Sequence, residues 1–101
     1  NMQSMIRQAQ KMQEDMAALQ EDLNAREYTA NAGGGAVTAT VNGTHELTKL
    51  EIRPDVVDPD DVEMLADLVR AAVNEAIRQA AETSQTEMNK LTGGMSMPGL
   101  F

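Results

Sequence analysis

The first two dozen residues carry apolar side chains at alternating spacings of three and four. This a/d heptad pattern, with polar and charged residues between, is typical of a helix that packs along another helix. Strong helix formers, uninterrupted by glycine or proline, predict a helix from about Gln3 to Ala25. Little in a chain of 101 residues could cover this seam, so we expect it to face a partner, most simply a second copy. The interface residues that we expect are Met5, Met12, Met16, Leu19 and Leu23.

The middle of the chain changes to a period of two, which indicates strands. A short strand is predicted from Glu27 to Ala30, and the triple glycine 33–35 follows it. A second strand is predicted from Ala36 to Val41, with its valines and Ala39 on one face. A phosphate-binding loop would lead from a strand into a helix. Because this glycine run leads into another strand, a plain turn or bulge is the favoured interpretation.

Asn42-Gly43 is a strong hairpin signal and predicts a type I′ turn, in which both central residues have positive φ. The returning strand is expected over about 46–53, with Leu50 and Ile52 on its buried face. Leu47 is out of phase with these two residues. Either a bulge near the turn or a contact of Leu47 on the second face of the sheet is therefore expected.

A second long helix is predicted after Pro54. Asp58 is the expected N-cap and Pro59 the first helical residue. A broad apolar stripe then runs from Val62 to Ala80, and the period resumes later at Met88 and Leu91. Gly93-Gly94 should end the helix after about 33 residues. We expect its first half to pack on the sheet and its second half to project.

The predicted fold class is therefore α+β: a long N-terminal helix, a three-stranded antiparallel sheet with a hairpin, and a long C-terminal helix. We expect a single domain over residues 1–94 and a flexible C-terminal tail over 95–101. Both helices are longer than such a sheet can cover. This excess favours a homodimer.

Composition limits the possible chemistry. The chain has no cysteine, which excludes disulfides and thiolate metal sites, and its aromatic content of 2% leaves burial to aliphatic side chains. A core shared with a second subunit would help such a chain. With no long apolar segment, a cytoplasmic location is expected and no membrane partner.

Three features could suggest a catalytic or metal site, and each has a simpler interpretation. His45, the single histidine, lies beside the turn without a visible partner, so a solvated turn residue is favoured. Acidic residues around 55–63 lack the spacing of a calcium loop and serve helix capping. The methionines fit packing better than a copper site. No serine, threonine or lysine has an evident activating base. We therefore expect no enzymatic activity, no cofactor, no metal site and no small-molecule substrate.

Charge bears on nucleic-acid binding. The net charge is −8, with eight cationic against sixteen acidic residues, so any DNA contact would be weak and sensitive to salt. Arg7 and Lys11 are four residues apart on the first helix and share a face away from the seam. This pair, duplicated in a dimer, is the best candidate for phosphate contact.

Several ordered motifs resemble the YbaB/EbfC family of nucleoid-associated proteins. They include Gln-Ala-Gln-Lys-Met-Gln at 8–13, the glycine-rich strand and turn at 33–43, Leu-Glu-Ile-Arg-Pro at 50–54, the start of the second helix at 63–72, and pieces of the tail. The resemblance implies a small bacterial protein of the cytoplasm and nucleoid, dimeric with tweezer-like or intertwined arms, that binds duplex DNA with little sequence preference.

The family motif carries Lys11 over as a phosphate contact. Arg7 beside it and Lys90 near the end of the second helix are weaker candidates. Contacts of this kind would read the DNA backbone rather than the bases. An alternative from another class is a protein-interaction or scaffold module that uses the exposed Met-rich seams without binding DNA.

Overall fold

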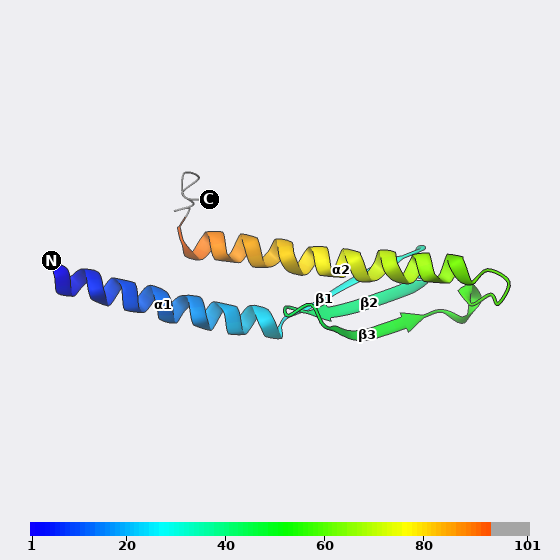
Figure 1. Cartoon of the computed structure of the whole chain (residues 1–101), viewed down its shortest axis with the longest axis horizontal. Helices are drawn as coiled ribbons and strands as arrows, with labels where there is room; N and C mark the ends of the chain where they lie inside the picture. The colour runs from blue at the N-terminus through cyan, green and yellow to red at the C-terminus, as the bar shows by residue number, and fades with distance from the viewer. Residues whose placement is uncertain (94–101) are drawn as a thin grey trace.

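The computed structural model describes residues 1–93 and confirms the predicted α+β fold (Figure 1). It is elongated, with extents of 71 × 27 × 16 Å. The expected flexible tail, 95–101, lies outside the described residues. The elements in chain order are α1 (Met2–Ala25), β1 (Glu27–Ala32), β2 (Val37–Asn42), β3 (Leu47–Ile52), the 3-10 turn η1 (Pro54–Val56) and α2 (Val62–Leu91).

The core lies between α2 and one face of the antiparallel sheet, whose strand order is β1-β2-β3. Alternate residues of β2 point at α2, as the period of two predicted. Small side chains on both surfaces let the helix approach the sheet closely, and these contacts replace the missing aromatic residues. The fully buried side chains of this layer are Val37, Ala39 and Val41 of the sheet and Ala72, Ala76 and Ala80 of α2.

Helix α2 packs on β1 and β2 and does not cover strand β3. The apolar residues of β3 pair with the buried residues of β2 and so belong to the same face of the sheet. Leu50 and Ile52 were expected to be buried, but they are exposed to 39% and 38%, and Leu47, which the register shift brings to the same face, is exposed to 47%. The expectation was wrong for this strand because one helix is too narrow to cover three strands. Residues 1–93 therefore leave open an apolar strip, named here the β3 face and formed by Leu47, Leu50 and Ile52.

The β2–β3 hairpin contains the expected bulge, because the register shifts between Thr40 and Val41. Its turn is not type I′. Residues 43–46 form the loop, closed by His45 N donating to Asn42 O at 3.0 Å, and the positive φ of 67° belongs to His45. Gly43 is needed for a different reason. A Cβ there would lie 1.8 Å from the carbonyl oxygen of Leu23 in α1.

We expect Gly43→Ala to lower the free energy of unfolding by about 3 kcal/mol, because overpacking against rigid backbone cannot relax. Chemical denaturation followed by circular dichroism measures this change. Gly34→Ala is the matched control. Gly34 has a φ of 67°, but a Cβ added there would meet no atom within 4 Å, so only backbone strain of about 1 kcal/mol is expected. Equal losses in the two variants would contradict the close-approach role of Gly43.

Helix α2 begins three residues later than predicted. Asp58 and Pro59 belong to a turn in which Asp58 accepts from the backbone N–H groups of Asp60 and Asp61, both at 2.9 Å. Asp61 is the N-cap, and its side chain accepts from Met64 N at 3.2 Å. The same Asp-rich sequence can cap at either position, and the chain reversal after η1 requires the later start.

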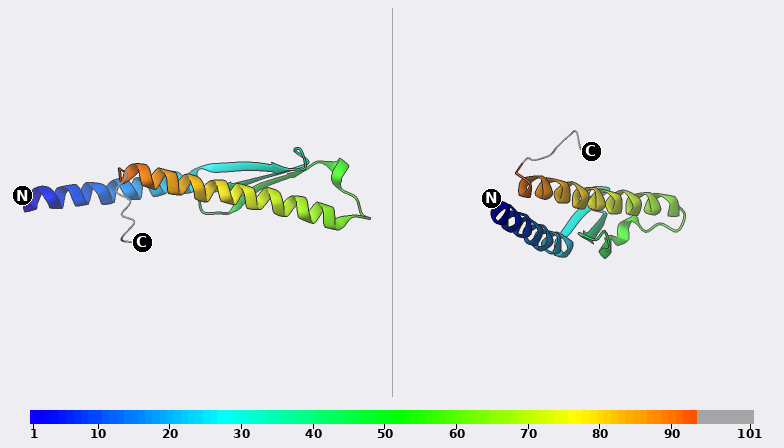
Figure 2. Two further views of the ribbon diagram at one scale, coloured as in Figure 1. Left: turned by 90° about the horizontal axis from the view of Figure 1, so that it is seen from above. Right: turned by 60° about the vertical axis from the view of Figure 1, so that its left-hand side comes forward.

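Contacts between the last turn of α1 and the rest of the chain determine the direction in which α1 runs. Leu23 is 2% exposed, and the hairpin residue Gly43 donates its N–H to Asn24 O at 3.2 Å. Arg26 at the end of α1 bridges to Glu87 of α2 at 3.2 Å. From there α1 runs alongside the C-terminal half of α2 and extends beyond its end (Figures 1 and 2). Only the proximal part of α1 is therefore supported by its own chain.

Candidate nucleic-acid interface

Charge is strongly segregated along the molecule. Residues 1–13 contain Arg7 and Lys11 and no acidic residue, a formal charge of +2, while the remainder carries −10. Within α1, residues 2–13 are the part that projects farthest from the sheet, named here the distal half of α1. A polyanion approaching this acidic molecule is attracted at one end and repelled over the rest.

The cations elsewhere are held by carboxylates. Among residues 1–93, Arg7 is the one lysine or arginine without a carboxylate oxygen within 4 Å. The hydrogen bonds that Arg26 donates to Asp22 and Glu87 raise the pKa of its guanidinium, and those that Arg78 donates to Glu75 raise the pKa of Arg78. To contact a phosphate, each of these cations must give up its carboxylate partner within the protein. Within the described residues, Arg7 has no such partner to give up.

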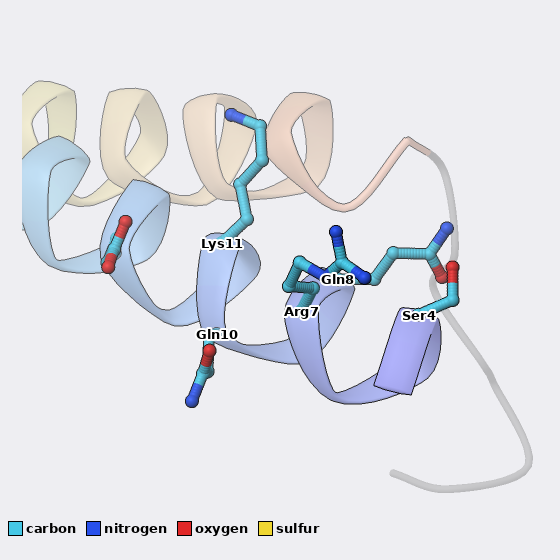
Figure 3. A pocket seen from close by; sticks show the side chains of 6 residues that line it. Ser4, Arg7, Gln8, Gln10 and Lys11 are labelled. Atoms are coloured by element: carbon cyan, nitrogen blue, oxygen red, sulfur yellow. The ribbon is translucent and has the colours of Figure 1, made fainter. Parts of the chain in front are cut away.

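Lys11 lies one helical turn from Arg7. Its Nζ is 3.4 Å from Asp15 Oδ2 in an exposed pair, which is worth little in water and can exchange for a phosphate. The same shallow hollow is lined by the polar side chains of Ser4, Gln8 and Gln10 and by the carboxylate of Glu14 (Figure 3). Serine and glutamine side chains are common donors to DNA phosphate oxygens. We name Ser4, Arg7 and Lys11 the cationic face.

The three residues expected to contact DNA therefore lie in two separate places. Arg7 and Lys11 lie together, as their spacing of four predicted, whereas Lys90 lies on α2 and has Glu87 Oε2 at 3.9 Å. Sequence reasoning did not single out Ser4, Gln8 and Gln10. A signal was present, because Ser4 is three residues before Arg7 and seven before Lys11, which is the spacing of one helix face.

The predicted partner seam is only partly open. Leu23 is buried within its own chain and offers no surface to another, while Met12 and Leu19 are half-buried. Met5 and Met16 remain exposed. The part of the seam that a partner could reach is therefore concentrated toward the distal half of α1.

Other candidate chemistry has little support within residues 1–93. His45 is exposed at the hairpin, and no cluster of three or more histidine or acidic residues in this part of the chain could hold a metal ion. The triple glycine forms a turn, as predicted, and φ is positive at each of its glycines. Neither described helix is long and apolar enough to cross a lipid bilayer.

Comparison with known proteins agrees with this arrangement. Residues 1–95 match the profile of the YbaB/EbfC DNA-binding family. A nucleoid-associated protein of Alkaliphilus metalliredigens is 56% identical, covering 100% of this chain and 89% of its own. One of Clostridium acetobutylicum is 54% identical, covering 99% and 89%. The crystal structure of an uncharacterized protein from Helicobacter pylori has the same fold, with a TM-score of 0.75 at 21% identity over 91% of this chain and 97% of its own.

Proposed function

The chain belongs to the YbaB/EbfC DNA-binding family, and from this premise we propose that it is a homodimeric nucleoid-associated protein that binds duplex DNA mainly through backbone contacts. Its relatives are named as nucleoid-associated proteins, which are not enzymes. We place its action at the nucleoid, in the cytoplasm. An architectural or regulatory role with little sequence preference follows from contacts that touch phosphates and leave base edges unread.

The observation that carries this proposal is the segregation of charge. Arg7 and Lys11 lie in a segment, residues 1–13, that contains no acidic residue in a chain with net charge −8, and Glu14 and Asp15 border that segment. Two copies present four such cations. Since affinity for duplex DNA falls with salt in proportion to the phosphates neutralised, we expect a slope of about −3 to −4 in log K against log salt.

The homodimer is proposed to form through the β3 face. This apolar strip lies on an edge strand, next to the core, and a second copy would extend the core across it. Joined there, two copies present two α1 helices as arms. Simultaneous contact by both arms strengthens binding through effective concentration, so a dimer binds DNA better than two separate chains.

Fluorescence anisotropy of a labelled duplex of about 30 base pairs, titrated at several salt concentrations, tests the DNA contact. We expect saturable binding with the slope given above and similar affinity for duplexes of unrelated sequence. Binding with no salt dependence, or strong preference for one sequence, would contradict backbone contact. Absence of binding at low salt would instead favour the protein-interaction module, whose partner would bind the exposed apolar faces.

A further inference from the structure

The distal half of α1 has a second surface that DNA contact leaves unused. Met2 and Met5 are exposed to 76% and 68%, and Ile6 and Ala9 are also exposed. With Met12 they form what we name the methionine face. At 3.6 residues per turn, this face is centred about 175° around the helix axis from Arg7 and Lys11. A helix that lays its cationic face on a duplex therefore turns its methionine face away from that duplex.

Residues 1–93 leave most of the methionine face uncovered, since Met2, Met5, Ile6 and Ala9 are exposed and Met12 is half-buried. The seam is buried by its own chain at Leu23, whereas the distal half of α1 extends past the end of α2 (Figures 1 and 2). A helical segment of about 12 residues is marginal in water when no neighbour packs against it. A heptad seam that continues into this segment is the pattern of a helix with a helical partner.

The residues that flank the methionine face indicate that its binding partner is the same helix of a second copy. Within residues 1–13 the e and g positions of the heptad are Ile6, which belongs to the face itself, and the flanking residues Asn1, Gln8 and Gln13, whose side chains are uncharged. Two identical faces can meet there without like charges being opposed. Outside residues 1–13 the chain carries −10, and its other open apolar strip, the β3 face, is already occupied in the proposed dimer.

Two other occupants fit less well. Duplex DNA requires cations or donors, and the methionine face has none. A membrane-bound amphipathic helix places cationic residues along the borders of its apolar face, close to the lipid headgroups. Here Arg7 and Lys11 lie on the opposite side of the helix, and the remaining negative charge of the protein is repelled by anionic lipids.

We propose that the methionine faces of two copies, belonging to different dimers, pair as helices. In such a pair each cationic face points outward on the opposite side from its partner's. The paired helices then hold two duplex segments on either side and bridge them. This consequence rests on the proposed function, whereas the pairing itself can be measured without DNA.

The variant Met2→Gln, Met5→Gln, Ile6→Gln makes the face polar without changing charge or the cationic face. Its matched control, Met2→Leu, Met5→Leu, Ile6→Leu, keeps the same positions apolar. Sedimentation velocity of the full chain between about 5 and 200 µM measures assembly, since association depends on concentration. We expect a four-chain species in the wild type and the leucine variant. In the glutamine variant its dissociation constant should rise at least about 30-fold, because three apolar side chains no longer leave water.

Capture of a labelled duplex by an immobilised duplex measures bridging. We expect the glutamine variant to lose capture while its affinity for a single free duplex stays unchanged. The proposal is overturned if the wild type never exceeds two chains, if the glutamine variant assembles and captures like the wild type, or if it falls to single chains. Binding of the wild type to liposomes of neutral and anionic lipids, abolished in the glutamine variant, would also overturn it in favour of a membrane surface. If pairing is observed but no duplex binds, the proposed function fails and the pairing stands.

Discussion

Reversing both charges of the cationic face, with Arg7→Glu and Lys11→Glu, is expected to lower affinity for duplex DNA at least about 100-fold at low salt. In a dimer the change removes four favourable contacts and introduces four carboxylates at the surface that approaches phosphate. Because both side chains are exposed and α1 packs on the core only near its end, the fold should be retained. Anisotropy of a labelled duplex measures the affinity, and circular dichroism measures helix content.

A control of equal net charge separates local contact from general repulsion. Lys49→Glu with Arg70→Glu changes the formal charge by the same amount, but each of these cations lies outside α1 beside a carboxylate, at Glu51 and Asp67. We expect a loss of less than about 10-fold for this pair, since screened charges distant from the duplex act weakly. Equal losses in the two double variants would mean that DNA senses only the net charge, and α1 would have no special role.

Leu50→Glu together with Ile52→Glu is expected to separate the dimer into single chains of 10.9 kDa. In the proposed interface both side chains leave water, and a desolvated carboxylate without a partner is strongly unfavourable. A rise of at least about 100-fold in the dissociation constant follows from the loss of two apolar contacts and the added charge. In the separate chain both positions are partly exposed, so the carboxylates can reach solvent and the fold should persist. Sedimentation equilibrium gives the mass directly.

Lys49→Gln with Glu51→Gln is the control for this interface. These residues alternate with Leu50 and Ile52 on the same strand and belong to the opposite face of the sheet. We expect the control to stay dimeric. If the double glutamate variant is folded and still dimeric, the β3 face is not the dimer interface, and the exposed part of the α1 seam becomes the next candidate.

Much of the fold could be predicted from local pattern. The heptad spacing predicted α1, and the alternation around Val37, Ala39 and Val41 predicted both β2 and its buried face. The out-of-phase Leu47 predicted the bulge that the register shift confirms. The pair Arg7 and Lys11 followed from a spacing of four. In each case the pattern reflects the geometry of a single element, so nothing distant was needed.

Features that depend on two elements were predicted less well. Asn42-Gly43 was interpreted as a turn requirement, whereas the glycine is needed because the α1 backbone lies against it. The N-cap was placed at Asp58, but the path of the chain after η1 selects Asp61. Arg26 could not be assigned to Glu87, a residue 61 positions away, until the two helices were seen side by side.

The sequence by itself determined the elements, their order, the apolar face of each and the charge of residues 1–13, because periodicity and charge are properties of short segments. Only the tertiary structure decided which of those apolar faces the chain covers. Within residues 1–93, helix α2 covers two of the three strands and α1 extends past the end of α2, so these residues leave the β3 face and most of the methionine face uncovered. Whether an apolar face is covered depends on how the width and length of the neighbouring element match it and on where that element lies. This relative placement exists only after the elements have packed.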